Sequence, residues 1–233
     1  MKPIACLTIL LLCVFSSASL QAQKLKDAFI DIKEKALRKE YSNLAMLPVV
    51  AAPAANAPDE IVALVAAEVR EIMEDEDFTL LPSAEVTAIR EQLASLYAVP
   101  GASMNEAAIA EHTMRELFYR HPVDGLLSVQ VLPVGAPFRD DKAEWAGTSQ
   151  KIENKGDGFF GTIMGTDYGG TIAASAILVT ISDRSGRPLY KWMGGVEVMM
   201  MRNGESLEPL PKEELWQSQK RVRKAVSYAL KPL

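Results

Sequence analysis

Residues 177–192 read ILVTISDRSGRPLYKW, a pattern typical of two β-strands joined by a tight turn. The first half lies in an apolar run over Thr171–Ser182, and the second half opens another over Leu189–Met201. The turn between them contains Gly186, which adopts positive φ at no steric cost. The stretch therefore predicts an antiparallel hairpin in the last third of the chain.

Glycines and methionines mark the second strand of this hairpin. Gly194 and Gly195 interrupt it, which predicts a bulge or the close approach of another backbone. Met199, Met200 and Met201 alternate across the strand, so we expect them to pack on both faces and not to form one ligand-binding surface.

Upstream of the hairpin, strands alternate with helices. Asn43–Val50 and Phe78–Leu81 are short apolar runs, and between them Asp59–Glu74 carries apolar side chains at helical spacing. A helix capped by Ser83 follows, with a predicted buried stripe of Val86, Ile89, Leu93 and Leu96. This order predicts a parallel pair of strands joined by a crossover helix.

The remaining elements complete the expected fold. Asn105–Arg120 reads as a helix, Asp124–Leu132 as a half-buried strand, and Pro211–Leu230 as a closing helix. The acids of the closing helix come first and its basic cluster, Lys220 to Lys224, comes later, as the helix dipole favours. The sequence thus predicts an α/β fold with a mixed sheet of about five strands flanked by helices.

The N-terminus has the pattern of a secretory signal peptide over residues 1–22. Lys2 precedes an apolar run from Ile4 to Phe15, and small and polar residues follow. Cleavage after Ala22 is the preferred prediction, and cleavage after Ala18 stays open. The two cysteines, Cys6 and Cys13, would leave with the leader, so the mature chain would have no thiol. The alternative is a lipoprotein acylated at Cys13.

Residues 23–42 follow as an amphipathic helical segment, with Leu25, Phe29 and Ile32 on one side from Lys24 to Tyr41. Docking on the protein's own core or on a partner is favoured over membrane binding, because acids accompany the lysines. Residues 43–233 are then expected to form a single α/β domain, exported to the periplasm, with at most peripheral membrane contact.

Composition excludes one class of partner. The chain of 233 residues has 25 Lys and Arg against 30 Asp and Glu, a net charge of −5. Proteins that bind nucleic acid by its phosphates need a basic surface. We therefore expect no nucleic-acid partner.

Motifs for cofactor or metal chemistry lack the context they require. Gly156, Gly158 and Gly161 spell G-x-G-x-x-G, but strand-like sequence follows where a dinucleotide site needs a helix. His112 and His121 are nine residues apart, not at the four-residue spacing of a metal pair. The acids Glu74 to Asp77 fit a solvated turn better than a metal site. We expect no cofactor, no metal and no catalytic residue.

The stretch Val134–Tyr168 carries the candidate binding site. Trp145, Phe159, Phe160 and Tyr168 are spread through sequence rich in glycine and charge, and exposed aromatic side chains often mark interaction surfaces. These four residues form a predicted partner-binding loop. The alternative is that Trp145, within the strand-like AEWAGTSQKI, packs on the sheet.

The order of these elements resembles a known family. The stretches NLAMLPVV, FTLLPSAEV, HPVDGLLSVQV and ILVTISDRSGRPLYKW, with helices between and after them, are similar to TolB amino-terminal-like domains of bacterial envelope proteins. The curli secretion channel lipoprotein and the lipoprotein activators of peptidoglycan synthases are relatives of that shape. The resemblance covers about residues 43 to 230 and implies a periplasmic or outer-membrane-associated protein that acts in binding or assembly. The chain departs from these lipoproteins by lacking a Cys after its leader.

These observations predict a non-catalytic component of the cell envelope that binds envelope proteins, with self-association left open. A secreted hydrolase with a carboxylate or Ser site is the alternative from another class. A carrier of a small apolar ligand, with a cavity lined by Met and Val side chains of the last two strands, is the third.

Overall fold

The computed structural model describes residues 28–97, 106–154, 169–204 and 206–233. The strands in this part of the chain are β1 (Ala28–Ile30), β2 (Asn43–Met46), β3 (Val50–Ala51), β4 (Thr79–Leu81), β5 (Gly125–Arg139), β6 (Lys142–Trp145), β7 (Thr148–Lys151), β8 (Gly169–Asp183), β9 (Pro188–Val198), β10 (Met200–Asn203) and β11 (Ser206–Pro209). The helices are α1 (Glu34–Glu40), α2 (Asp59–Asp75), α3 (Ser83–Tyr97), α4 (Glu106–Arg120) and α5 (Gln219–Leu230), with short 3-10 turns η3 (Pro53–Ala55) and η5 (Lys212–Glu214).

The fold is a mixed α/β structure, as the sequence predicted, around a sheet of nine strands. Among the described residues its main path runs β1-β9-β8-β5-β2-β4, with β3 and β6 paired to β5 and β7 paired to β6. Strand β2 pairs in parallel with β4 and with β5, which confirms the predicted parallel pair. Strands β5, β8 and β9 are antiparallel, so the larger part of the sheet is antiparallel.

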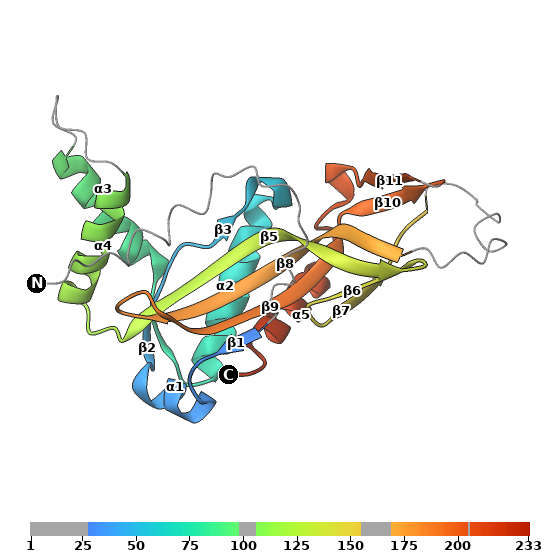
Figure 1. Cartoon of the computed structure of the whole chain (residues 1–233). Helices are drawn as coiled ribbons and strands as arrows, with labels where there is room; N and C mark the ends of the chain where they lie inside the picture. Colours follow the sequence, from blue (N-terminus) through green and yellow to red (C-terminus); the bar gives the residue numbers. More distant parts are fainter. Residues whose placement is uncertain (1–27, 98–105, 155–168, 205) are drawn as a thin grey trace, which may run out of the picture.

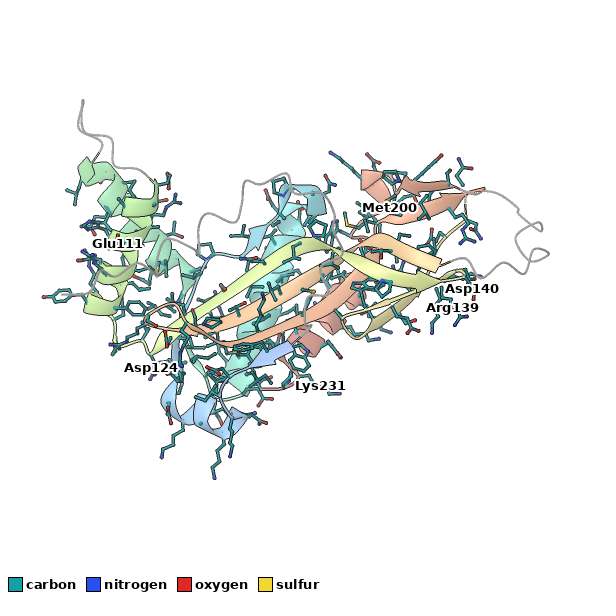
Figure 2. The ribbon with its side chains drawn as sticks, viewed as in Figure 1. Glu111, Asp124, Arg139, Asp140, Met200 and Lys231 are labelled. Atoms are coloured by element: carbon teal, nitrogen blue, oxygen red, sulfur yellow. The ribbon has the colours of Figure 1, made fainter. Side chains whose placement is uncertain are left out.

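Helices cover the sheet unevenly (Figure 1). Helices α2 and α5 lie on one face of the long strands, and between them and the sheet is the main core. Helices α3 and α4 project from one end of the molecule, and β6, β7, β10 and β11 lie at the other. Figure 2 marks these ends, with Glu111 on α4 and Asp140 at the opposite tip. None of the described helices is long and apolar enough to cross a membrane.

The β8–β9 hairpin confirms the first prediction, and the neighbouring strand β5 is longer than predicted. Gly186 has φ of 82° in the turn between β8 and β9, as expected. However, β5 continues to Arg139, whereas the sequence predicted a strand ending at Leu132. Pro133 and Pro137 do not break this strand. Between Val131 and Phe138 its only described neighbour is β8, so a proline nitrogen that faces away from β8 has no strand to which an N–H would donate.

The segment 23–42 is not one helix in the residues described. Ala28–Ile30 form β1, which pairs with β9 at the edge of the sheet, and α1 begins only at Glu34. The apolar spacing of Phe29 and Ile32 fits a helix equally well, but the free edge of β9 offers backbone partners that a helix would forgo. Leu37 of α1 is buried in the main core, so this segment packs on the protein itself.

Candidate functional site

A small pocket lies between the β6–β7 hairpin, β9 and the beginning of α5. Its volume is about 140 Å³. We call it the β7–α5 pocket, and it is lined by Thr148, Ser149, Gln150, Gly195, Val196, Arg221 and Lys224. None of the described residues that line it is acidic, and it is too small for a drug-sized molecule, which needs roughly 300 to 1,000 Å³.

Two glycines bring the walls of the pocket together. A Cβ on Gly194 would lie 1.9 Å from the carbonyl oxygen of Ala225 in α5. A Cβ on Gly195 would lie 2.6 Å from Nε1 of Trp145. The predicted close approach at these glycines is therefore confirmed, and it involves the backbone of α5 on one side and the Trp145 ring on the other.

Hydrogen bonds fix the β6–β7 hairpin against β9. The Thr148 hydroxyl donates to the carbonyl oxygen of Gly195 at 2.6 Å, and the Gly195 N–H donates to Ala146 at 2.9 Å. The N–H of Val198 donates to Oε1 of Gln150 at 3.1 Å. Since a backbone N–H only donates, the Gln150 oxygen must face Val198, and its NH₂ group points elsewhere.

A buried carboxylate supports Arg221. Glu197 is only 4% exposed. Its Oε1 accepts the backbone N–H of Trp216 at 2.5 Å, and its Oε2 lies 3.7 Å from Nη1 of Arg221. Burial raises the pKa of Glu197, while the Trp216 hydrogen bond and the charge of Arg221 act in the opposite direction. Glu197 therefore holds one end of a guanidinium that lines the pocket.

Trp216 adopts an unusual backbone conformation beside Glu197. Its φ is 63°, a left-handed value that costs a non-glycine residue about 1–2 kcal/mol. The hydrogen bond to Glu197 and one from its indole Nε1 to Ala55 at 3.0 Å hold it in place. The segment before α5 is thus fixed to both β9 and η3.

The basic cluster does not suit the helix dipole, contrary to the sequence prediction. The predicted helix from Pro211 breaks after η5, and α5 begins at Gln219 with Ser218 as its cap. Lys220, Arg221, Arg223 and Lys224 therefore occupy the first turns, where the dipole disfavours cations. Arg221 pairs with Glu197, and Arg223 pairs with Glu68 at 3.2 Å.

Of the predicted partner-binding loop, the structure describes only Trp145. Trp145 is 8% exposed at the end of β6, and its Nε1 donates to the carbonyl oxygen of Ser175 at 3.1 Å. Its ring packs in a second core with Ile172, Ala176 and Met193, so the alternative of packing on the sheet holds for this residue. Phe159, Phe160 and Tyr168 lie outside the described residues, as do Gly156, Gly158 and Gly161.

A second candidate surface is the pair of helices α3 and α4, which we call the helical arm. A small third core, with Val86, Ile89 and Leu117, joins the arm to the start of β2 and β5. The predicted buried stripe of α3 does not continue to Leu96, which is 63% exposed because the helix extends beyond the sheet at that point. Tyr119 of α4 is 86% exposed. The arm thus presents two large apolar side chains to solvent.

The histidines lie on and just after α4, and the three consecutive methionines lie where β9 passes into β10. His112 and His121 are half-buried on and after α4, and no group of three or more His, Cys, Asp or Glu among the described residues could hold a metal. Met199 and Met201 are buried, and Met200 is half-buried. The methionines therefore pack on both sides of the chain, as the alternation predicted.

Glu197 and the pocket were missed by sequence reasoning. The only signal for Glu197 was a charged residue within the apolar stretch GGVEVMM, and buried acids are almost always paired. The position of β7 next to α5 had no signal in the sequence. These two segments are far apart along the chain, and both contact β9.

Comparisons with known proteins give little to place beside this geometry. No protein-family model matches the chain, and no curated protein matches it. Among solved structures, the chain is similar to the crystal structure of lipoprotein GNA1162 from Neisseria meningitidis. That similarity covers 71% of this chain and 84% of the other at 15% identity, with a TM-score of 0.34.

Proposed function

We propose that this chain is a non-catalytic component of the bacterial cell envelope, exported to the periplasm, that binds envelope proteins. The observation that carries the proposal is the helical arm, where Leu96 and Tyr119 are the most exposed large apolar side chains among the described residues. Large exposed aromatic and aliphatic side chains on one projecting element are typical of protein-binding surfaces.

The leader-like N-terminus and the resemblance to TolB amino-terminal-like domains support the envelope part of the proposal. The architecture of the arm supports the binding part. Leu96 lies at the end of α3 and Tyr119 at the end of α4, and neither belongs to the core that joins the arm to the sheet, so a partner can contact them without disturbing the main core.

The test compares the exported chain with a double variant, Leu96→Ser and Tyr119→Ser. Both side chains are exposed, so the free energy of unfolding of the double variant should lie within about 0.5 kcal/mol of that of the original chain. We expect the tagged chain in the periplasmic fraction, with envelope proteins that co-purify from detergent extracts and that the double variant loses. Val50→Ser is the matched control, because Val50 is an exposed apolar residue outside the arm.

Two results would count against the proposal. One is a chain that stays with its leader in the cytoplasm. The other is a set of co-purifying proteins that is the same for the double variant and for the original chain, which would remove the arm from the interaction.

A further inference from the structure

The β7–α5 pocket has the chemistry of an anion site. Its lining residues include Arg221, Lys224, Ser149 and Gln150, whose side chains carry a guanidinium, an ammonium, a hydroxyl and an amide. Arg and Lys have hydrogen-bond donors and no acceptor, and the Gln150 oxygen is already occupied by Val198. The polar groups left for a ligand are therefore mainly donors.

The charges around the pocket are not balanced within the protein. Arg221 has Glu197, but among the described residues no carboxylate lies within 4.0 Å of the Lys224 ammonium. Arg221 also lies in the first turn of α5, where the helix dipole disfavours a cation, and Lys224 lies in the second turn. A bound anion would offset both the mutual repulsion and this cost.

Glu197 gives the pocket a supporting layer beneath Arg221. A buried carboxylate is unfavourable unless it is paired, and here the pairing restrains one end of the Arg221 guanidinium. Thr148 and Gln150 are likewise held by hydrogen bonds to β9. The lining is therefore fixed from two sides before any ligand arrives.

We propose that the β7–α5 pocket binds a phosphate group, with Arg221 and Lys224 as its charged ligands and Gln150 as a neutral donor. Arg presents a fork of N–H donors suited to phosphate oxygens, and Lys adds a point charge. The volume of about 140 Å³ suits one such group and not a whole nucleotide or lipid, so the remainder of a larger ligand lies outside. Glu197 acts as a positioning residue.

The test is calorimetric titration of the whole mature chain with inorganic phosphate at low salt. We expect saturable binding that Lys224→Gln weakens at least tenfold, with Arg221→Gln having a similar effect. Because Arg221 also pairs with Glu197, Lys224→Gln is the variant that leaves internal contacts intact. Arg223→Gln is the matched control, since it removes the same charge from the same helix but pairs with Glu68, away from the pocket. It should change the affinity less than twofold.

A second arm identifies the source of the phosphate. Vesicles of phosphatidylcholine with phosphatidylglycerol are floated with the original chain and with Lys224→Gln. Flotation of the original chain alone, with competition by free phosphate, indicates a lipid phosphodiester. Phosphate binding without flotation indicates a soluble phosphate compound. The proposal is overturned if the original chain binds neither probe, or if Arg223→Gln weakens binding as much as Lys224→Gln does.

Discussion

The contact between β9 and α5 gives a sharp prediction for Gly194→Ala. The new Cβ would lie 1.9, 2.6 and 2.9 Å from the carbonyl oxygen, carbonyl carbon and Cα of Ala225, all of them backbone atoms. Ordinary contact begins at 3.4 Å, so α5 must move about 1.5 Å away from the sheet. That movement would loosen the buried face of the helix, made of Val222, Ala225, Val226, Ala229 and Leu230.

The expected cost follows from two opposing terms. Overpacking a core typically costs about 1–3 kcal/mol, and a rigid helix backbone places this site near the top of that range. Replacing glycine by alanine stabilises the folded state by about 0.4–1 kcal/mol, because it lowers the conformational entropy of the unfolded chain. The net loss of about 2 kcal/mol should lower Tm by roughly 4–8 °C in a protein of this size.

Urea unfolding followed by circular dichroism measures this loss, with Gly170→Ala as the control. A Cβ on Gly170 meets only the tip of the Phe138 ring, at 3.2 and 3.5 Å, so this variant should stay within about 0.5 kcal/mol of the original chain. If Gly194→Ala is as stable as the original chain, or if both variants lose the same stability, the packing of α5 against β9 is not as described.

Three further variants test other parts of the structure. For Glu197, burial raises the pKa, so the folded state binds the proton more tightly than the unfolded state and stability falls as pH rises above about 4.3. Glu197→Gln should remove this fall. The prediction is contradicted if the variant and the original chain lose stability in parallel when urea unfolding is measured from acid to neutral pH. For Asp183, burial alone would raise the pKa, but hydrogen bonds from Ser185 and Arg187 lower it below its usual value. The stability that the carboxylate contributes is therefore present at neutral pH and lost in acid. Asp183→Ala should lower the free energy of unfolding by about 1–2 kcal/mol at pH 7 and by almost nothing near pH 2, as chemical unfolding at both pH values would measure. Leu117→Ala should cost about 2–5 kcal/mol if the arm unfolds with the domain, and hydrogen exchange that accelerates only in α3 and α4 would instead show that the arm opens separately.

Much of the fold could be predicted because its signals are local. The apolar spacing of Asp59–Glu74 matches α2 within one residue, and Gly186 marks the turn between β8 and β9. Gly194 and Gly195 also signalled a close approach correctly, since few other reasons place two glycines inside a buried strand. These features depend on a few neighbouring residues.

The errors arise where tertiary contacts decide. Phe29 and Ile32 have helical spacing, but Ala28–Ile30 pair with the open edge of β9 as a strand. The acids near Pro211 form only η5, because Trp216 takes a left-handed conformation that Glu197 stabilises from another strand. Leu96 repeats the spacing of a buried stripe, yet the sheet ends before it does.

The candidate site was harder to predict than the fold for the same reason. Trp145 was assigned to the predicted partner-binding loop, but it is buried at the end of β6, and one sequence could not show that Gly195 leaves space for its ring. The β7–α5 pocket joins residues 148–150 to residues 221–224, and no short motif connects them.

Cross-linking inside living cells tests most directly whether the arm binds an envelope protein. A photoreactive amino acid would replace Tyr119 in the exported chain, and in a second strain it would replace Lys142, an exposed residue at the opposite end of the molecule. We predict a discrete adduct with an envelope protein, in the periplasmic fraction, from position 119 and none from position 142. Equal labelling from both positions, or none from position 119, would contradict the proposed function.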